Sequence, residues 1–119
     1  GSLVVEGARN YPILYRNYEF FTFVPINREP LENRLHLVDN AAEVLNRWMG
    51  DTRFTAAYLL ITTSQKAEIE MLGNLPSGAL DRIEEQLHQS DEFIVLYENE
   101  DAVIFTLRSR VNEDIPFSP

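Results

Sequence analysis

Short runs of apolar and β-branched residues along the chain predict strands. Residues 18–24 (YEFFTFV) stop at Pro25, and residues 54–62 (FTAAYLLIT) form a nearly continuous apolar run. Because that second run has no polar face, we expect it to be a central strand buried on both faces. Near the start of the chain, residues 3–5 and 13–15 predict short extended pieces.

A stripe of apolar residues at intervals of three and four predicts a helix after Pro30, which is suited to a first helical position. Gly50 is a typical residue for ending that helix. The helix has an alternative start near Asn40, because Asn40 followed by Glu43 resembles a capping box. The stripe consists of Leu31, Leu35, Val38, Ala42, Leu45 and Met49, with Trp48 beside its end, and we expect Trp48 to belong to the core.

The second half of the chain predicts two shorter helices. Thr63 or Ser64 is expected to cap the first, which runs to about Leu72 and ends at Gly73. Ser77 is the expected cap of the second, whose apolar residues then recur at helical spacing.

The chain closes with a predicted hairpin, in which runs 93–97 (FIVLY) and 102–107 (AVIFTL) flank a polar turn. The alternation of strands and helices predicts an α/β fold, a single compact domain with a mixed β-sheet, helical crossovers and a C-terminal β-hairpin. We assign this domain to residues 3–108. Residues 109–119 contain two prolines and no periodicity, so we expect a flexible tail.

Composition narrows the classes of partner. The 119 residues carry a net charge of −9, which disfavours nucleic acid and anionic membrane surfaces as partners. There is no cysteine, so disulfides and thiolate chemistry are excluded. Gly1-Ser2 is interpreted as a cloning scar before a domain taken from a longer protein.

The candidate binding site is Thr62, Thr63, Ser64 and Gln65, where a buried strand runs into a helix. Open α/β sheets bind ligands at this edge, and free N–H groups at a helix start suit an anion such as a phosphate, while the hydroxyls suit a sugar. The alternative is that these residues only cap the helix. No glycine-rich phosphate loop accompanies them.

No catalytic residue, cofactor or metal site is predicted. His36 and His88 are the two histidines, and neither belongs to a zinc-binding or triad motif. A metal site formed by His88 with Asp91 and Glu92 is the weaker interpretation, since a histidine at a helix end also interacts favourably with the helix dipole. The acidic turn at 98–101 lacks the spacing of a calcium loop.

The order of short sequence motifs in residues 57–107 resembles that of a known protein family. YLLITTSQ at Tyr58–Gln65 is followed by LPSGAL within Gly73–Leu80, and by FIVLYENEDAVIF at Phe93–Phe105. This pattern is similar to the soluble terminal segment of bacterial multi-spanning membrane proteins in the lipid-sugar-dependent glycosyltransferase superfamily. The resemblance implies an extracytoplasmic domain that follows the last transmembrane helix. The family's catalytic acids lie in membrane-proximal loops, so none is carried over here.

Three hypotheses follow. The first is a non-catalytic extracytoplasmic accessory domain of a polytopic membrane protein, itself a glycosyltransferase. Its partners are then the transmembrane portion of the parent chain and a sugar or lipid-linked sugar. The second is a free-standing ligand-binding or regulatory module, with its site at Thr62–Gln65 and dimerisation through the aromatic strand 18–24. The third is a small acidic hydrolase, which needs convergent carboxylates with raised pKa values.

Overall fold

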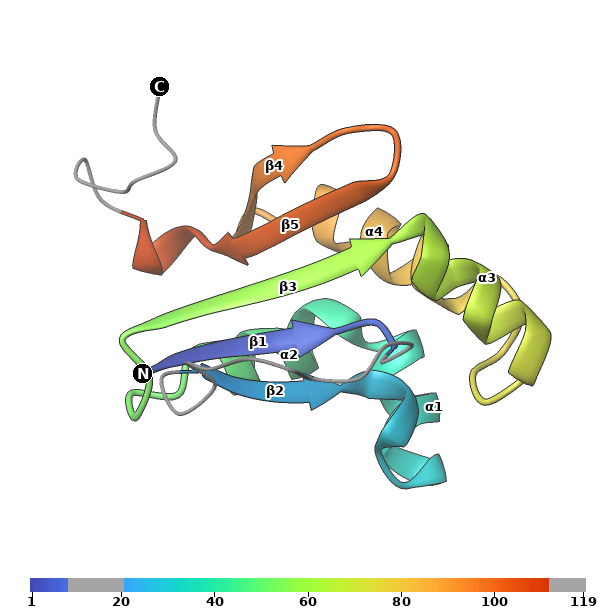
Figure 1. The fold of residues 1–119 in the computed structure, drawn as a ribbon. Coiled ribbons are helices and arrows are strands. Elements are labelled where there is room, and N and C mark those ends of the chain that lie inside the picture. Colours follow the sequence, from blue (N-terminus) through green and yellow to red (C-terminus); the bar gives the residue numbers. More distant parts are fainter. Residues whose placement is uncertain (9–20, 112–119) are drawn as a thin grey trace.

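Five strands form one mixed sheet in the order β2-β1-β3-β5-β4 (Figure 1). The computed structural model describes residues 1–8 and 21–111. β1 pairs in parallel with β2 and β3, whereas β5 pairs antiparallel with β3 and β4, which confirms the mixed sheet and the terminal hairpin. The strands are β1 (Ser2–Glu6), β2 (Phe21–Pro25), β3 (Ala56–Thr62), β4 (Phe93–Glu98) and β5 (Ala102–Leu107).

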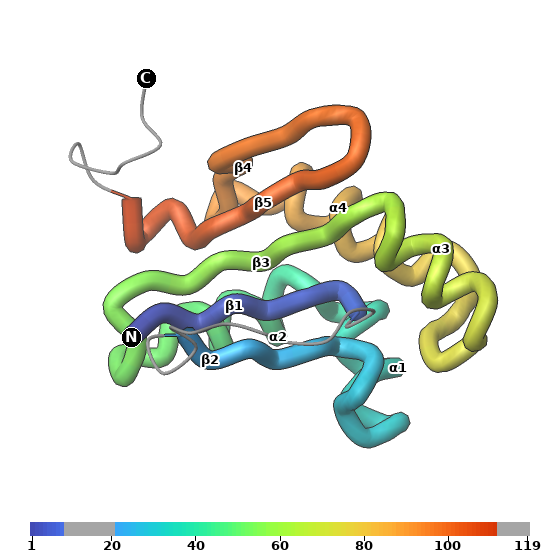
Figure 2. Tube along the Cα trace, viewed as in Figure 1, coloured from blue at the N-terminus to red at the C-terminus, as the bar shows by residue number. Residues whose placement is uncertain are grey.

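Two helical crossovers connect the parallel strands, as the sequence predicts. β2 leads through α1 and α2 to β3, and β3 leads through α3 and α4 to β4. Both crossovers run in the same direction across the sheet, from the β2 side toward the β4 side. Because crossovers between parallel strands are right-handed, the helices of both lie on the same face of the sheet. Figures 1 and 2 show α2 and α4 behind the sheet. The helices are α1 (Leu31–Asp39), α2 (Ala41–Met49), α3 (Thr63–Leu72) and α4 (Ala79–Gln89), with short 3-10 turns at η2 (Ile26–Arg28) and η3 (Arg108–Arg110).

The central strand β3 is buried on one face and partly exposed on the other. Ala57, Leu59 and Ile61 are almost inaccessible, whereas Tyr58 and Leu60 are half-buried. The expectation of burial on both faces was therefore wrong, because both helical crossovers cover the same face of the sheet. A continuous apolar run predicts a central strand correctly, but it does not predict how many faces the helices cover.

The predicted helix of residues 31–49 is two helices, separated at Asn40. Asn40 has φ −136° and ψ 45°, and its side chain caps no backbone N–H; instead its Nδ2 donates to the carbonyl oxygen of His36 (3.0 Å). Gln86 of α4 bridges the break: its Nε2 donates to Val38 O (2.6 Å) and its Oε1 accepts from Ala41 N (2.8 Å). The expected capping box at Asn40 is absent, because Gln86 supplies the polar partners from another helix.

The cap of α3 is Thr62, one residue before the two expected positions. Thr62 Oγ1 accepts from Gln65 N (3.0 Å), and Gln65 Oε1 accepts from Thr62 N (3.1 Å), which is a reciprocal capping box. The expectation of Thr63 or Ser64 as the cap was wrong, since β3 extends through Thr62 and the helix begins at once. The predicted end is confirmed, with Gly73 at φ 67° in the left-handed conformation.

We expect Thr62→Ala to lower the free energy of unfolding by about 1 kcal/mol, the usual contribution of such a cap. Thr63→Ala is the matched control, because Thr63 is exposed and its hydroxyl makes only a 3.4 Å contact, with Glu100 O, in the described part of the chain. Urea denaturation of both variants measures the difference. A larger loss for Thr63→Ala than for Thr62→Ala would contradict this cap.

The connection between α3 and α4 is organised by Glu70. Its carboxylate accepts from the Ser77 hydroxyl and from Gly78 N, both at 2.7 Å. The bond from the Gly78 backbone, with that from Ser77, lowers the pKa of Glu70. Ser77 is thus not the cap of α4 as predicted; Gly78, at φ 73°, directly precedes the helix.

The chain remains ordered beyond the expected domain end at residue 108. Arg108–Arg110 form η3, and the Arg110 guanidinium donates to the carbonyl oxygens of Met49 (2.6 Å), Asp51 (2.6 Å) and Phe54 (2.9 Å). The predicted tail therefore starts too early. Its residues 112–119 lie outside the described part of the chain, as do the predicted extended piece 13–15 and residues 18–20 of the aromatic strand. Among the described helices, none has the length and hydropathy to cross a bilayer.

Candidate functional site

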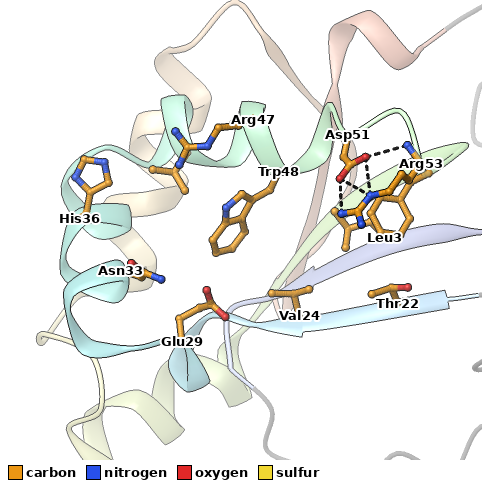
Figure 3. Close-up of a pocket in the computed structure, with 12 residues that line it drawn as sticks. Leu3, Thr22, Val24, Glu29, Asn33, His36, Arg47, Trp48, Asp51 and Arg53 are labelled. Carbon is orange, nitrogen blue, oxygen red and sulfur yellow. Dashed lines mark hydrogen bonds and ion pairs between the residues drawn. The ribbon is translucent and has the colours of Figure 1, made fainter.

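A groove of about 370 Å3 lies between the helices α1 and α2 and the sheet margin formed by β1 and β2 (Figure 3). Its walls come from segments that are far apart in the sequence: β1, β2, the η2–α1 turn, both helices and the loop before β3. A concave site with an apolar wall and a few converging polar groups is the usual form of a small-ligand site. This groove is therefore the candidate functional site.

Trp48 forms the aromatic wall of the groove. It lies four residues after Val44 on α2, at the margin of the buried stripe of that helix. Helical spacing thus leaves the indole half-buried, packed on the core and facing the groove. The prediction that Trp48 belongs to the core describes only one side of the ring. The other apolar lining residues are Leu3, Val24, Val44 and Phe54.

Three polar side chains at the groove have no partner within the described part of the chain. Glu29, Asn33 and Arg47 line the groove, and their side chains make no hydrogen bond or ion pair with residues 1–8 or 21–111. Figure 3 shows the Glu29 carboxylate and the Asn33 amide directed toward the Trp48 side of the groove, and the Arg47 guanidinium beyond Trp48, on the side of His36. These groups are available to a ligand.

The opposite end of the groove is closed by an ion pair. Arg53 Nη2 lies 2.7 Å from Asp51 Oδ2, and Arg53 Nε donates to both carboxylate oxygens. The hydrogen bonds from Arg53 lower the pKa of Asp51 below its ordinary value. Because Asp51 and Arg53 neutralise each other, Glu29 and Arg47 are the charges that the groove offers to a ligand.

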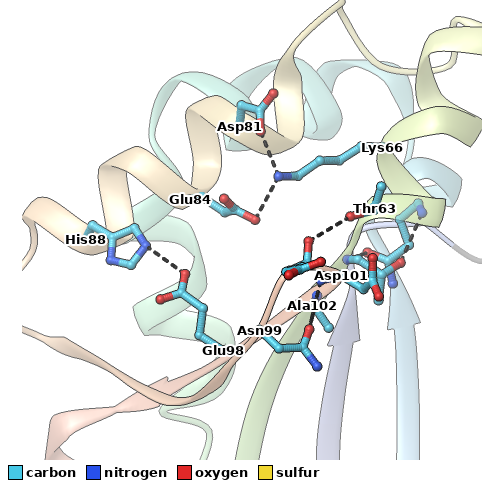
Figure 4. A network of polar contacts seen from close by, with 12 residues as sticks. Thr63, Lys66, Asp81, Glu84, His88, Glu98, Asn99, Asp101 and Ala102 are labelled. Atoms are coloured by element: carbon cyan, nitrogen blue, oxygen red, sulfur yellow. Dashed lines mark hydrogen bonds and ion pairs between the residues drawn. The ribbon is translucent and has the colours of Figure 1, made fainter.

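The predicted site at Thr62, Thr63, Ser64 and Gln65 lies at the C-terminal end of β3 (Figure 4). Two of the N–H groups expected to bind an anion already have partners: Gln65 N donates to Thr62 Oγ1 (3.0 Å), and Thr63 N donates to Asp101 O (2.8 Å). The structure therefore gives Thr62 and Gln65 the capping role that was the alternative interpretation. Ligand binding by this segment stays a prediction.

The surroundings of this helix start are acidic. The small hollow beside it, of about 190 Å3, is lined by four carboxylates and one lysine: Glu84, Glu98, Glu100, Asp101 and Lys66. Lys66 Nζ is already paired, at 2.8 Å from Asp81 and 3.1 Å from Glu84. Partial burial acts to lower the pKa of Lys66, but its bonds to both carboxylates outweigh burial and raise it. An anion is therefore better accommodated in the groove, where Arg47 is not paired with any residue of the described ranges.

The weaker metal hypothesis placed a site at His88, Asp91 and Glu92. His88 Nε2 instead lies 4.0 Å from Glu98 Oε2, and its ring packs edge-on against Phe105. Glu92 accepts a hydrogen bond from Asn46. Within residues 1–8 and 21–111, no three His, Asp or Glu side chains are grouped so as to hold a metal ion.

Sequence reasoning missed the groove because its residues belong to segments whose proximity depends on the fold. One usable signal was present: Trp48 lies beside the apolar stripe rather than within it, so part of the ring had to face outward. Nothing in the sequence placed Glu29 or Asn33 opposite that ring. Comparisons with protein-family models, with curated proteins and with solved structures found no match.

Proposed function

We propose that this chain is a non-catalytic accessory domain that binds a small ligand in the groove beside Trp48. One observation carries the proposal: a half-buried indole faces the groove beside Glu29, Asn33 and Arg47, whose side chains have no partner among residues 1–8 and 21–111. Because these side chains make no hydrogen bond or ion pair within the described ranges, a ligand can bind them without displacing a partner from that part of the chain.

The proposed ligand is a sugar or a lipid-linked sugar. A sugar ring has an apolar C–H face that stacks on an aromatic ring, and hydroxyl groups around its edge. Carboxylate, amide and guanidinium groups are hydrogen-bonding partners for those hydroxyls, as acceptors, donors or both. Glu29, Asn33 and Arg47 provide one group of each kind, and Trp48 provides the ring.

The proposal places the domain in a larger protein. The resemblance of residues 57–107 supports a parent that is a polytopic membrane protein of the lipid-sugar-dependent glycosyltransferase superfamily. In that setting the domain lies on the extracytoplasmic face of the cell membrane, with the transmembrane portion of the parent chain as its partner. Hydrophobic segments of about 20 residues in the parent reading frame would support this arrangement. Their absence would favour the free-standing binding module.

The ligand is tested by thermal shift of the purified domain against monosaccharides, nucleotide sugars and polyprenyl phosphate analogues. A ligand that binds only the folded state raises its stability by about 2.7 kcal/mol at a hundred times its dissociation constant. A reproducible rise in Tm with one of these probes supports the proposal. No rise with any probe, on a well-folded sample, contradicts it.

Arg47→Gln is expected to weaken binding of the active probe about tenfold or more, since hydrogen bonds to a charged group contribute about 1.5–3 kcal/mol. The unliganded Tm should not change, because Arg47 is exposed and unpartnered within the described residues. Arg28→Gln is the matched control: it removes the same charge from an exposed position that does not line the groove. Calorimetric titration measures both, and equal losses would indicate only a general charge effect.

A further inference from the structure

The two helical walls of the groove meet at the break between α1 and α2. Asn33 and His36 line the groove from α1. Arg47 and Trp48 line it from α2 (Figure 3). The distance between these two sets of side chains therefore depends on the angle at which the helices meet. Residues at the ends of helices and strands, where the backbone angles can change, are the usual hinges of binding sites.

Helix α1 is buried only in the turn next to this break. Leu37 and Val38 are its buried residues, whereas α2 has four buried residues spread along its whole length. The middle of α1 is held by a polar contact, from Arg34 Nη1 to Asn74 O (2.5 Å), which leads to the connection between α3 and α4 and not to α2. The positions of the groove residues of α1 relative to α2 therefore depend on the junction between the two helices.

Gln86 of α4 holds this junction, although it does not line the groove. Its Nε2 donates to Val38 O at the end of α1 (2.6 Å), and its Oε1 accepts from Ala41 N at the start of α2 (2.8 Å). The last carbonyl groups of one helix and the first N–H groups of the next have no partner within their own helix. A single planar amide thus bonds to both helix ends and sets the distance between them.

A neighbouring contact between α4 and α1 is weaker. Arg82 forms an ion pair with Asp39, but both side chains are at least half exposed. Exposed ion pairs contribute little to stability, and this pair does not reach α2. Gln86, which is half-buried and bonds to both helices, therefore has the stronger influence on the angle between them.

We propose that Gln86 is a positioning residue of the groove, which holds α1 and α2 at the angle that sets the distance of Asn33 and His36 from Trp48. Groups that contact a ligand must themselves be held in place by supporting hydrogen bonds, and Gln86 supplies two of them at the junction. The effect of Gln86 on ligand affinity rests on the proposed function of the groove. Its effect on the geometry of the groove does not, and is measured without a ligand.

The fluorescence of Trp48 tests the geometry, because this residue is the single tryptophan among the 119 residues. Gln86→Met removes both hydrogen bonds and keeps a long side chain. When α1 is released the indole becomes more exposed, so we expect a larger Stern–Volmer constant for acrylamide quenching and emission at longer wavelength. Gln86→Glu, which keeps an acceptor for Ala41 N, is the second variant should Gln86→Met fail to fold by circular dichroism. Unchanged quenching and emission in the folded variant overturn the proposal.

Two controls separate this effect from a general loosening of the domain. Gln89→Met makes the same replacement on α4, at an exposed position whose amide contacts Glu85 of the same helix. Thr62→Ala weakens the cap of α3, which lies outside the groove. Neither control should change the quenching or the emission of Trp48. A change in either control as large as that in the Gln86 variant overturns the proposal.

Calorimetric titration with a probe that binds the groove measures the effect on affinity. Supporting residues that touch no ligand change affinity by roughly twofold to thirtyfold, which is the loss expected for Gln86→Met and not for Gln89→Met. An affinity equal to that of the unchanged protein overturns the role of Gln86 in binding. If no probe binds the unchanged protein, the proposed function fails, while the quenching result still decides whether Gln86 positions the walls of the groove.

Discussion

Replacing Leu59 with aspartate is expected to leave the domain unfolded at room temperature. Leu59 is fully buried at the centre of β3, between Val5 of β1 and Phe105 of β5. The substitution loses the burial of the leucine side chain and places a carboxylate in an apolar layer without a partner. Because a domain of this size is stable by about 5–15 kcal/mol, the two losses together remove most or all of it. Loss of the cooperative melting transition by circular dichroism is the expected observation.

Two further variants make this result interpretable. Leu59→Ala should still fold but lose about 2–5 kcal/mol, which measures the cavity alone. Leu60→Asp should be milder than Leu59→Asp, because Leu60 lies on the opposite face of β3 and is only half-buried. If Leu60→Asp is as damaging as Leu59→Asp, the one-sided burial of β3 is wrong.

Replacing Arg110 with methionine is expected to lower the free energy of unfolding by about 2–4 kcal/mol. The guanidinium donates to three carbonyl oxygens, those of Met49, Asp51 and Phe54, which lie at the end of α2 and in the loop before β3. Hydrogen bonds to a charged group contribute about 1.5–3 kcal/mol each, and partial exposure reduces the sum. Chemical denaturation measures the loss.

Arg108→Met is the control for this prediction, because it removes an arginine from the same 3-10 turn. The Arg108 side chain is exposed and, within residues 1–8 and 21–111, makes a single hydrogen bond, from Nε to Asp91 O (2.8 Å). Its loss should cost less than about 1 kcal/mol. Equal effects of the two substitutions would show that Arg110 acts only through its general charge or its helix propensity.

The local pattern of apolar residues was sufficient to predict the position of β3 and of the two strands of the terminal hairpin. The runs at residues 54–62, 93–97 and 102–107 have the length and composition of strands, and the structure confirms all three within two residues of their expected bounds. The same holds for the end of α3 at Gly73, because a left-handed residue after a helix is a local requirement. A strand or a helix end that is determined by neighbouring residues can be predicted from those residues alone.

The break at Asn40 has a distant cause. The apolar stripe continues through it, and the local residues resemble a capping box, so pattern reasoning favours either one helix or a different start. The polar groups exposed at the break are satisfied by Gln86, more than forty residues away along the chain. Tertiary contacts thus decide a boundary that local periodicity leaves open.

The groove also depends on tertiary contacts that local sequence patterns do not predict. Trp48 is visible in the sequence as an aromatic residue at helical spacing, but Glu29 and Asn33 become its neighbours only when α1, α2 and the sheet margin meet. The predicted segment Thr62–Gln65 was found because strand-to-helix junctions are local. The strongest local signal therefore indicated a cap, whereas the position of Trp48 beside the apolar stripe was the one local sign of the groove.

The hydrogen bonds of Arg110 also bear on how the domain is made. Synthesis proceeds from the N-terminus, so the loop between α2 and β3 is complete long before Arg110 leaves the ribosome. Until then the carbonyl oxygens of Met49, Asp51 and Phe54 lack the donor that holds them, and β3 lacks its antiparallel neighbour β5. We therefore expect a chain that ends before β5 and Arg110 to be less stable than the complete domain, because it lacks contacts that hold the loop before β3 and one side of β3.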